Sequence, residues 1–339
     1  MQTRLGYASS VSAADTPTSA PEREVSVVAV VVAYNRRDLL KVALDALAAQ
    51  THRLAGVVVV DNRSDDDSEV VAAEHPIGAE VLSLSRNTGG AGGFAAGIAH
   101  ALSVFGPECV WLMDDDTIPT PTALEELVRA RAEYPEPVAL LGSRVVWRDG
   151  RDHPMNTPRR RPGATSDEIK DSQAVGAVPV RSSSFVSMLV DSRAIRFHGL
   201  PVADYFIWND DFEFSCRLLR RGIGLYVPGS VVEHRTKVFG ATDVDPGDRF
   251  YYEVRNKLWM LTRSPSLSPE ERLLYTGSSL RRWVRTFARS SRRDVLRRAA
   301  LKGARDGILR SPRPTVRVLD GAGVPAKEIL EVEAGAGRA

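Results

Sequence analysis

The sequence predicts an α/β fold with an open parallel sheet and helices on both faces. Residues 25–33 form a near-continuous run of β-branched and small apolar residues, which is typical of a parallel strand buried on both faces. Strand-like and helix-like segments then alternate over the first third of the chain. Polar residues follow the ends of several predicted strands, and such sheets bind ligands at these carboxyl ends. We therefore expect the functional site at that edge.

The hydrophobic pattern places each element in turn. After the strand at 25–33, apolar residues at helical spacing predict a helix over 38–49. Further strands are predicted at 56–60, 79–84, 109–113, 185–191 and 225–232, and further helices at 68–75, 92–104, 122–133 and 210–221. The stretch 148–175 is basic and rich in Gly, Pro and polar residues, so we expect a long surface loop there. After Asp248 the pattern is helical and basic.

Four regions are expected: a disordered leader at 1–23, the main α/β domain at 24–260, a basic helical region at 261–315 and a flexible tail at 316–339. The leader has no basic stretch followed by an apolar one, so no signal peptide is visible. No apolar run reaches the ~18 residues of a membrane span. Cys109 and Cys216 lie far apart in apolar segments, which favours buried thiols in a reducing compartment. We expect a cytoplasmic protein that is soluble or peripheral to a membrane.

Three consecutive carboxylates, Asp114, Asp115 and Asp116, follow the apolar strand that ends at Met113. Such a cluster repels itself unless a cation is bound, and hard divalent ions prefer oxygen ligands. The sequence therefore predicts a Mg²⁺ or Mn²⁺ site. The alternative is a solvated turn in which Asp116 or Thr117 caps a helix.

Two other strand ends place polar groups on the same edge. Residues Ala33, Tyr34, Asn35 and Arg36 follow the first strand, and Asp61 and Asn62 follow the second. An aspartate at a strand end can accept a hydrogen bond from a base or a ribose. The alternative is ordinary turn and cap chemistry by Asp and Asn.

A glycine-rich run, Arg86-Asn87-Thr-Gly-Gly-Ala-Gly92-Gly93-Phe94, joins the third strand to a helix. Glycine permits unusual backbone angles and the close approach of a ligand, so a phosphate or ribose could reach the backbone here. A tight strand-to-helix turn needs the same residues, which is the alternative interpretation.

The second half of the chain supplies a base and a further ligand. Trp208-Asn-Asp210-Asp211 lies at a predicted helix start, where a carboxylate could take a proton from a sugar hydroxyl and the indole could stack on a sugar ring. We assign Asp211 as the general base; helix capping by Asp210 is the alternative. His234 follows a strand, and its imidazole could join the carboxylates as a metal ligand, although a lone histidine is more often structural.

Taken together and in this order, these motifs resemble those of glycosyltransferase family 2, the inverting transferases with a Rossmann-like GT-A fold. The matching segments are residues 32–36, 59–62, 86–94, 114–116, 208–211 and 231–234, which cover roughly residues 25–260 of the chain. The ordered set is much more specific than any one motif.

The resemblance implies a nucleotide-diphosphate sugar donor and a divalent cation, Mn²⁺ or Mg²⁺. It implies that Asp114, Asp116 and His234 hold the cation, that Asp115 contacts the donor sugar or ribose, and that Asp211 is the catalytic base. The candidate donor-binding residues are Ala33, Tyr34, Asn35, Arg36, Asp61, Asn62, Arg86, Asn87, Gly92, Gly93, Asp114 and Asp115, and the candidate acceptor-binding residues are Trp208 and Asp210.

Within the family, the glycine-rich run, the Asp triplet, the Trp208–Asp211 element and residues 251–256 are similar to actinobacterial galactofuranosyltransferases and rhamnosyltransferase-like relatives. This similarity implies UDP-galactofuranose as donor, with dTDP-rhamnose as the alternative, and a lipid-linked or cell-envelope glycan as acceptor. Asn209 stands where galactofuranosyl enzymes often have Asp or Gly. The implied mechanism is one displacement with inversion at the anomeric carbon and no covalent intermediate.

The basic region at 281–310 is the remaining feature. A broken apolar stripe there, including Trp283, Phe287 and Leu296, lies among arginines, as in a helix that contacts anionic lipid. Packing of this helix on the core is the alternative. The net charge of +2, from 45 basic and 43 acidic residues, and the absence of a recognised motif argue against a nucleic-acid partner. A nucleotidyltransferase or a non-catalytic nucleotide-sugar-binding protein remains as an alternative function class.

Overall fold

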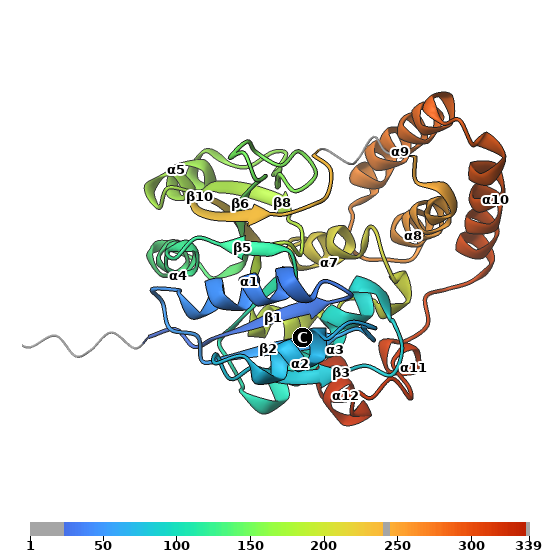
Figure 1. Ribbon diagram of the computed structural model, residues 1–339. Helices are drawn as coiled ribbons and strands as arrows, with labels where there is room; N and C mark the ends of the chain where they lie inside the picture. The colour runs from blue at the N-terminus through green and yellow to red at the C-terminus, as the bar shows by residue number, and fades with distance from the viewer. Residues whose placement is uncertain (1–23, 240–244, 337–339) are drawn as a thin grey trace, which may run out of the picture.

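One large sheet, covered by helices on both faces, forms the body of the computed structural model, which describes residues 24–239 and 245–336 (Figure 1). Its strands are β1 Val27–Ala33, β2 Gly56–Asp61, β3 Glu80–Ser83, β4 Cys109–Asp114, β5 Thr117–Pro119, β6 Val138–Val146, β7 Arg159–Arg160, β8 Val178–Ser182, β9 Met188–Asp191 and β10 Ile223–His234. Its helices are α1 Arg37–Ala48, α2 Ser68–Glu74, α3 Gly89–Val104, α4 Ala123–Glu133, α5 Ser166–Ala174, α6 Ser192–His198, α7 Asp210–Leu218, α8 Phe250–Thr262, α9 Pro269–Arg289, α10 Arg293–Leu309, α11 Thr315–Val318 and α12 Ala326–Gly335.

The predicted α/β class is confirmed, and the first half of the sheet is parallel as expected. The strand order is β3-β2-β1-β4-β9-β6-β10-β8-β7, with β5 paired to β10. β3, β2, β1 and β4 are parallel neighbours. β9 runs antiparallel between β4 and β6, so the second half of the sheet is mixed. The expectation of a parallel sheet therefore holds only for the part that the alternating pattern covers.

The two core layers lie on either side of β1, whose seven residues are all buried. One layer packs beneath α3, and the other lies beneath α1 and α4. Each fully buried valine or leucine contributes about 1.5–3 kcal/mol to folding. This explains why the run at 25–33 was an unambiguous signal for a central strand.

Glycines let α3 lie against the sheet. The helix begins at Gly89, three residues before the predicted start at 92. A Cβ on Gly93 would stand 2.6 Å from a methyl of Val32, and one on Gly97 would stand 2.5 Å from a methyl of Val30. Any larger residue would push α3 off β1, so close helix–strand packing accounts for these glycines.

The predicted surface loop at 148–175 is wrong in part, because it contains β7 and α5. Thr165 and Glu168 form a capping box at the start of α5: the Thr165 hydroxyl accepts from Glu168 N at 3.1 Å, and the Glu168 carboxylate accepts from Thr165 N at 2.8 Å. The helix buries little apart from Ser172, so it has no apolar period. The capping box was the sequence signal for this helix.

The C-terminal region is also organised differently from the expectation. The boundary placed at residue 260 falls inside α8. Residues 316–336, expected to be a flexible tail, form the rest of α11 and α12, which packs on α3 and α6 (Figure 1). Leu319, Ile329 and Val332 are buried in the core layer beneath α3, and this burial holds the segment in place. The leader at 1–23 lies outside the described residues.

α8, α9 and α10 form a helical arm beside the sheet (Figure 1). Phe250 and Val254 of α8 pack on Leu296 of α10, with Trp283 and Phe287 of α9 against the same cluster. The apolar stripe predicted at 281–310 is therefore largely the inner face of this arm. In the described ranges, no helix combines the length and the hydrophobicity needed to cross a bilayer.

Candidate active site

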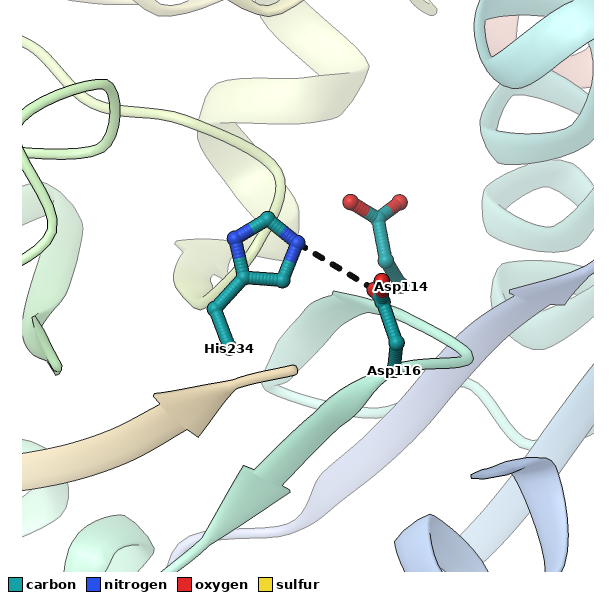
Figure 2. A group of neighbouring side chains, drawn as sticks. All are labelled: Asp114, Asp116 and His234. Atoms are coloured by element: carbon teal, nitrogen blue, oxygen red, sulfur yellow. Dashed lines mark ion pairs between the residues drawn. The ribbon is translucent and has the colours of Figure 1, made fainter. Parts of the chain in front are cut away.

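The candidate site lies at the carboxyl edge of the sheet, where β1, β2 and β4 end side by side. Val32 of β1 pairs with Asp114 at the end of β4. The chain then turns back as β5, which pairs antiparallel with β10, so that Thr117 lies opposite His234. This pairing brings the imidazole of His234 beside Asp116, the residue before Thr117 (Figure 2). Residues far apart in the sequence thus lie side by side.

Asp114, Asp116 and His234 form a compact group of potential metal ligands. One ligand atom of each lies within 4.8 Å of the other two. Asp116 Oδ1 is 3.2 Å from His234 Nε2, yet this buried oxygen has no hydrogen-bond partner in the described part of the chain. The other ring nitrogen, Nδ1, is 3.0 Å from Asn156 Oδ1 and donates to it. In a neutral imidazole Nε2 then carries a lone pair that faces a carboxylate oxygen, so the donor set fits Mn²⁺ or Mg²⁺.

The pKa shifts of the acidic residues and of His234 also fit a site for a divalent cation. Burial, reinforced by the charge of Asp116, raises the pKa of Asp114 to about 6. Burial also raises the pKa of Asp115 to about 7, although Arg36 opposes this shift. For His234, burial opposes the charged form, but Asp116 and Asp114 outweigh it and raise the pKa. Without a cation the cluster therefore retains protons, and a divalent ion would displace them.

Asn156 orients the histidine. Its Nδ2 donates to Ser184 Oγ at 3.3 Å, which directs the amide oxygen toward His234 Nδ1 at 3.0 Å. Partners of this kind fix the tautomer of a metal ligand. We expect Asn156→Ala to weaken Mn²⁺ binding about 10- to 100-fold in calorimetry, and Asn156→Asp to retain most of the affinity. Wild-type affinity in the alanine variant would contradict this role.

The loop after β1 is fastened to the acidic cluster. Tyr34 N donates to Asp115 Oδ2 at 2.9 Å, and Arg36 Nη1 donates to Asp115 Oδ1 at 3.1 Å. The same Arg36 nitrogen also pairs with Asp116. Asn35 adopts a left-handed backbone with φ of 54°, which Asn tolerates better than most residues. Tyr34 and Arg36 therefore lie at the cluster, while Asn35 shapes the loop.

Asp61 is the last residue of β2 and Asn62 follows it, but only Asp61 has a side-chain oxygen without a partner among the described residues. Asp61 is 3% exposed and its Oδ1 has no hydrogen-bond partner within residues 24–239 and 245–336. Asn62 Oδ1 accepts from Thr88 N at 2.8 Å, its Nδ2 donates to Gly89 O at 2.9 Å, and its backbone N donates to the buried Ala33 O at 2.9 Å. Asp61 thus suits an N–H or O–H of a nucleotide, whereas Asn62 and Ala33 support the fold.

The residues of the glycine-rich run make contacts within the protein. Arg86 Nη2 donates to Val318 O at 2.7 Å and to Asp320 O at 2.9 Å, which fastens the C-terminal segment to the sheet edge. Asn87 Oδ1 accepts from Gly89 N at 2.8 Å and closes the turn into α3. Gly92 and Gly93 are buried within α3. Because these residues have structural partners, we leave Arg86, Asn87, Gly92 and Gly93 out of the donor site proposed below.

The start of α7 brings two more carboxylates to this edge. Burial, together with the charge of Asp211, raises the pKa of Asp210 well above its ordinary value. Burial likewise raises the pKa of Asp211, whose Oδ1 accepts from Phe212 N at 2.6 Å. The charge of Asp211 raises the pKa of Asp114, and the charge of Asp114 raises that of Asp210, so the α7 carboxylates lie near the group of potential metal ligands. The preceding Trp208 is half-buried.

Two cationic side chains, Lys257 and Arg159, lie near enough to Asp211 for their charges to act on it. The Lys257 ammonium lies 4.9 Å and the Arg159 guanidinium 4.6 Å from the ring centroid of Phe212, the next residue. Both charges lower the pKa of Asp211 and oppose the effect of burial. Lys257 is 3% exposed, and burial lowers its own pKa to about 8. These cations favour the ionised, proton-accepting form of Asp211.

We expect Lys257→Met to move the acidic limb of the kcat/KM pH profile to higher pH. Removing the ammonium removes one influence that lowers the pKa of Asp211, so this pKa rises and a higher pH is needed to ionise this candidate base. Lys327→Met, at an exposed lysine of α12, is the matched control and should leave the limb in place. A limb that stays unchanged in Lys257→Met, or moves to lower pH, would contradict the assignment.

Several of these residues escaped the sequence analysis. Asn156 and Arg159 lie in the stretch expected to be a loop, and nothing in their local sequence marks them. Lys257 lies in α8, directly after the run at 251–256 that carried part of the resemblance but received no role. A lysine among apolar and aromatic residues of a helix was the available signal for a buried cation.

Comparison with known proteins shows which family the chain resembles. The profile described as Glycosyl transferase family 2 matches residues 28–221, more than half of the chain. Galactofuranosyltransferase GlfT1 of Mycobacterium tuberculosis H37Rv is 32% identical over 268 residues, which cover 70% of this chain and 83% of that protein. GlfT1 of Mycolicibacterium smegmatis is 32% identical over 203 residues, and the match spans 58% of this chain and 66% of the relative.

Solved structures show the same fold. S. aureus TarS 1–349 in complex with UDP-GlcNAc superposes with a TM-score of 0.57 at 16% identity, over 91% of this chain and 90% of that one. GalNAc-T7 with UDP, GalNAc and Mn²⁺ gives a TM-score of 0.56 at 16% identity, over 90% of this chain and 59% of that one. These likenesses establish the GT-A architecture. The chain therefore belongs to glycosyl transferase family 2 and carries a glycosyltransferase domain with the GT-A fold.

Proposed function

We propose that this protein is an inverting, cation-dependent glycosyltransferase that transfers galactofuranose from UDP-galactofuranose to a lipid-linked or cell-envelope glycan. The observation that carries the proposal is the group of Asp114, Asp116 and His234 at the carboxyl edge of the sheet, near enough to Asp211 for its charge to act on Asp114. The donor is proposed from the relatives, which are named as galactofuranosyltransferases. A structural neighbour holds UDP, GalNAc and Mn²⁺, which supports a nucleotide sugar and a cation.

In the proposed reaction Asp211 accepts the proton of an acceptor hydroxyl. The hydroxyl oxygen forms a bond to the anomeric carbon while the bond from that carbon to the diphosphate breaks, so the configuration inverts. A divalent ion held by Asp114, Asp116 and His234 would supply positive charge for the departing diphosphate. Asp61 Oδ1 accepts a hydrogen bond from the nucleotide, and Trp208 offers a ring face to the acceptor. The charges of Lys257 and Arg159 favour the ionised form of Asp211 and oppose the effect of burial.

A donor panel tests this function. UDP-galactofuranose, UDP-galactopyranose, dTDP-rhamnose and a GDP-sugar are compared for Mn²⁺-dependent binding and for slow release of free nucleotide. We expect binding and turnover of UDP-galactofuranose. Preference for dTDP-rhamnose would overturn the proposed donor but keep the transferase mechanism. Failure of every nucleotide sugar to bind would overturn the enzymatic function.

Membrane contact is proposed for a face of α9 that overlaps the predicted basic region 281–310 only in part. Leu273, Leu280 and Val284 recur along one face of α9 and are 76%, 53% and 69% exposed. Arg281 and Arg285 are exposed beside this face. Apolar side chains flanked by arginines suit anionic lipid. We propose that this α9 face contacts the inner leaflet of the plasma membrane, where a lipid-linked acceptor would be available.

Vesicle flotation checks this contact. The double variant Leu280→Asp/Val284→Asp should reduce binding to vesicles that contain anionic lipid about 100-fold or more, since each buried apolar side chain contributes about 1.5–3 kcal/mol and each ~1.4 kcal/mol is a factor of ten. Val70→Asp, at a 50% exposed valine of α2, is the matched control and should bind like the wild type. Equal flotation of the double variant and the wild type would rule out the α9 face.

A further inference from the structure

The turn that carries Asp210 and Asp211 has an unusual backbone. Phe206, Trp208 and Asn209 have φ angles of 64°, 65° and 63°. Side chains other than glycine rarely adopt this left-handed region, and the first two residues are bulky aromatics. Strained backbone of this kind persists only where surrounding contacts hold it. The neighbouring elements must therefore fix the turn.

Asn256 of α8 supplies the central contact. Its side chain is completely buried, and its Nδ2 lies 2.9 Å from Tyr205 O, 2.9 Å from Ile207 O and 2.8 Å from Trp208 O. One amide group thus donates to the carbonyls on both sides of Phe206 and to that of Trp208. Arg255 Nε donates to Asn256 Oδ1 at 2.9 Å, which fixes the orientation of the amide.

Two further contacts close the turn from other sides. Asn209 Nδ2 donates to Glu253 Oε2 at 2.9 Å, and Glu253 belongs to α8, one turn before Asn256. On the opposite side, Ala91 N in the first turn of α3 donates to Phe206 O at 3.1 Å. A Cβ on Gly89 would stand 2.1 Å from that same oxygen, so only glycine lets the turn approach α3. The turn is held between α3 and α8.

We propose that Asn256 is a positioning residue: its buried amide holds the strained turn at 205–209 in the conformation that directs Asp211 toward the acceptor hydroxyl. The inference rests on the role proposed above for Asp211. Asn256 itself touches no reacting atom, because its amide donates to the turn's carbonyls. Its removal deprives the three carbonyls of a shared donor, and the backbone can then relax toward ordinary φ angles.

Two substitutions separate this role from simple packing. Asn256→Asp keeps the shape of the side chain but replaces the donating amide with an acceptor, which repels the three carbonyl oxygens. Asn256→Ala removes the group altogether. Leu296→Ala is the matched control, because Leu296 is buried against α8 in the arm but makes no contact with the turn. It should lower thermal stability without altering the turn.

The first readout is hydrogen exchange of the peptide that covers residues 203–213, followed by mass spectrometry. Both Asn256 variants should exchange faster in this peptide than the wild type, and Leu296→Ala should not. This measurement needs no enzymatic activity, so it tests the clamp even if the proposed function fails in the donor panel. Unchanged exchange in Asn256→Asp would overturn the proposal.

The second readout is steady-state kinetics with Mn²⁺. A displaced base lowers kcat, and small misplacements of a reacting group can cost about 100-fold, so we expect a loss of that order in both Asn256 variants. Affinity for UDP should stay within about threefold of the wild type, because the proposed donor contacts lie at the ends of the sheet strands and not on the turn. Faster exchange with undiminished kcat, or loss of UDP affinity in place of kcat, would show that the turn does not position the base.

Discussion

Asp211→Asn should lower kcat about 100- to 10,000-fold while leaving UDP affinity nearly unchanged. The substitution keeps the size of the side chain but removes the group that accepts the acceptor proton, and general-base catalysis contributes about that much. Because Asp211 is not one of the potential metal ligands Asp114, Asp116 and His234, the cation and the diphosphate should still bind. Single-turnover transfer and calorimetry with UDP check both parts.

Asp210→Asn provides the comparison for this experiment. Burial raises the pKa of Asp210 well above its ordinary value, which favours the neutral carboxyl, and a neutral amide has a similar shape and charge. The loss of kcat should be much smaller than for Asp211→Asn. If Asp210→Asn were the more damaging change, the base would be Asp210 and the assignment of Asp211 would be wrong.

Asp116→Ala should abolish the stabilisation by Mn²⁺ and lower transfer about 1000-fold or more. Asp116 is 1% exposed and offers the buried oxygen that has no hydrogen-bond partner in the described structure. Cation chemistry at a leaving group contributes several kcal/mol, and each ~1.4 kcal/mol corresponds to a factor of ten in rate. Thermal unfolding with and without Mn²⁺, together with transfer assays, measures both effects.

The pH dependence of this stabilisation has a definite sign. The folded-state pKa of Asp114 is raised to about 6, so without metal its contribution to stability is lost as pH rises through that value. Mn²⁺ should therefore raise the Tm more at pH 7.5 than at pH 5. Asp294→Ala, at an exposed carboxylate of α10, is the control and should keep the full response to Mn²⁺. A wild-type response to Mn²⁺ in Asp116→Ala would exclude this metal site.

The sequence predicted the elements that have a clear hydrophobic pattern, either a continuous apolar run or apolar residues at helical spacing. It also predicted the candidate site residues at the ends of those elements. β1, β2 and β4 are buried apolar runs, and the parallel register brings Asp61 and Asp114 to one edge. β5 is only three residues long and carries no pattern, yet its pairing with β10 is what brings His234 to the acidic residues. The local pattern offered His234 only as one possible ligand, and it was the resemblance to a family that implied this role.

The glycine-rich run shows why the remaining site residues were harder to assign. A phosphate-binding turn and a helix packed closely on a strand need the same small residues, and the sequence does not distinguish them. In the structure Gly93 lies on Val32, and Gly89 admits the carbonyl of Phe206. Likewise, the apolar residues at 283–299 could face lipid or protein, and their packing on α8 depends on contacts between distant segments.

Product stereochemistry tests the central claim most directly. The wild-type enzyme is incubated with UDP-galactofuranose, Mn²⁺ and a panel of octyl glycosides, and the anomeric configuration of the first product is determined by NMR. A single displacement with Asp211 as base predicts a galactofuranoside whose configuration is opposite to that of the donor, formed only when the cation is present. A product that retains the donor configuration, or equal product in EDTA, would contradict the account.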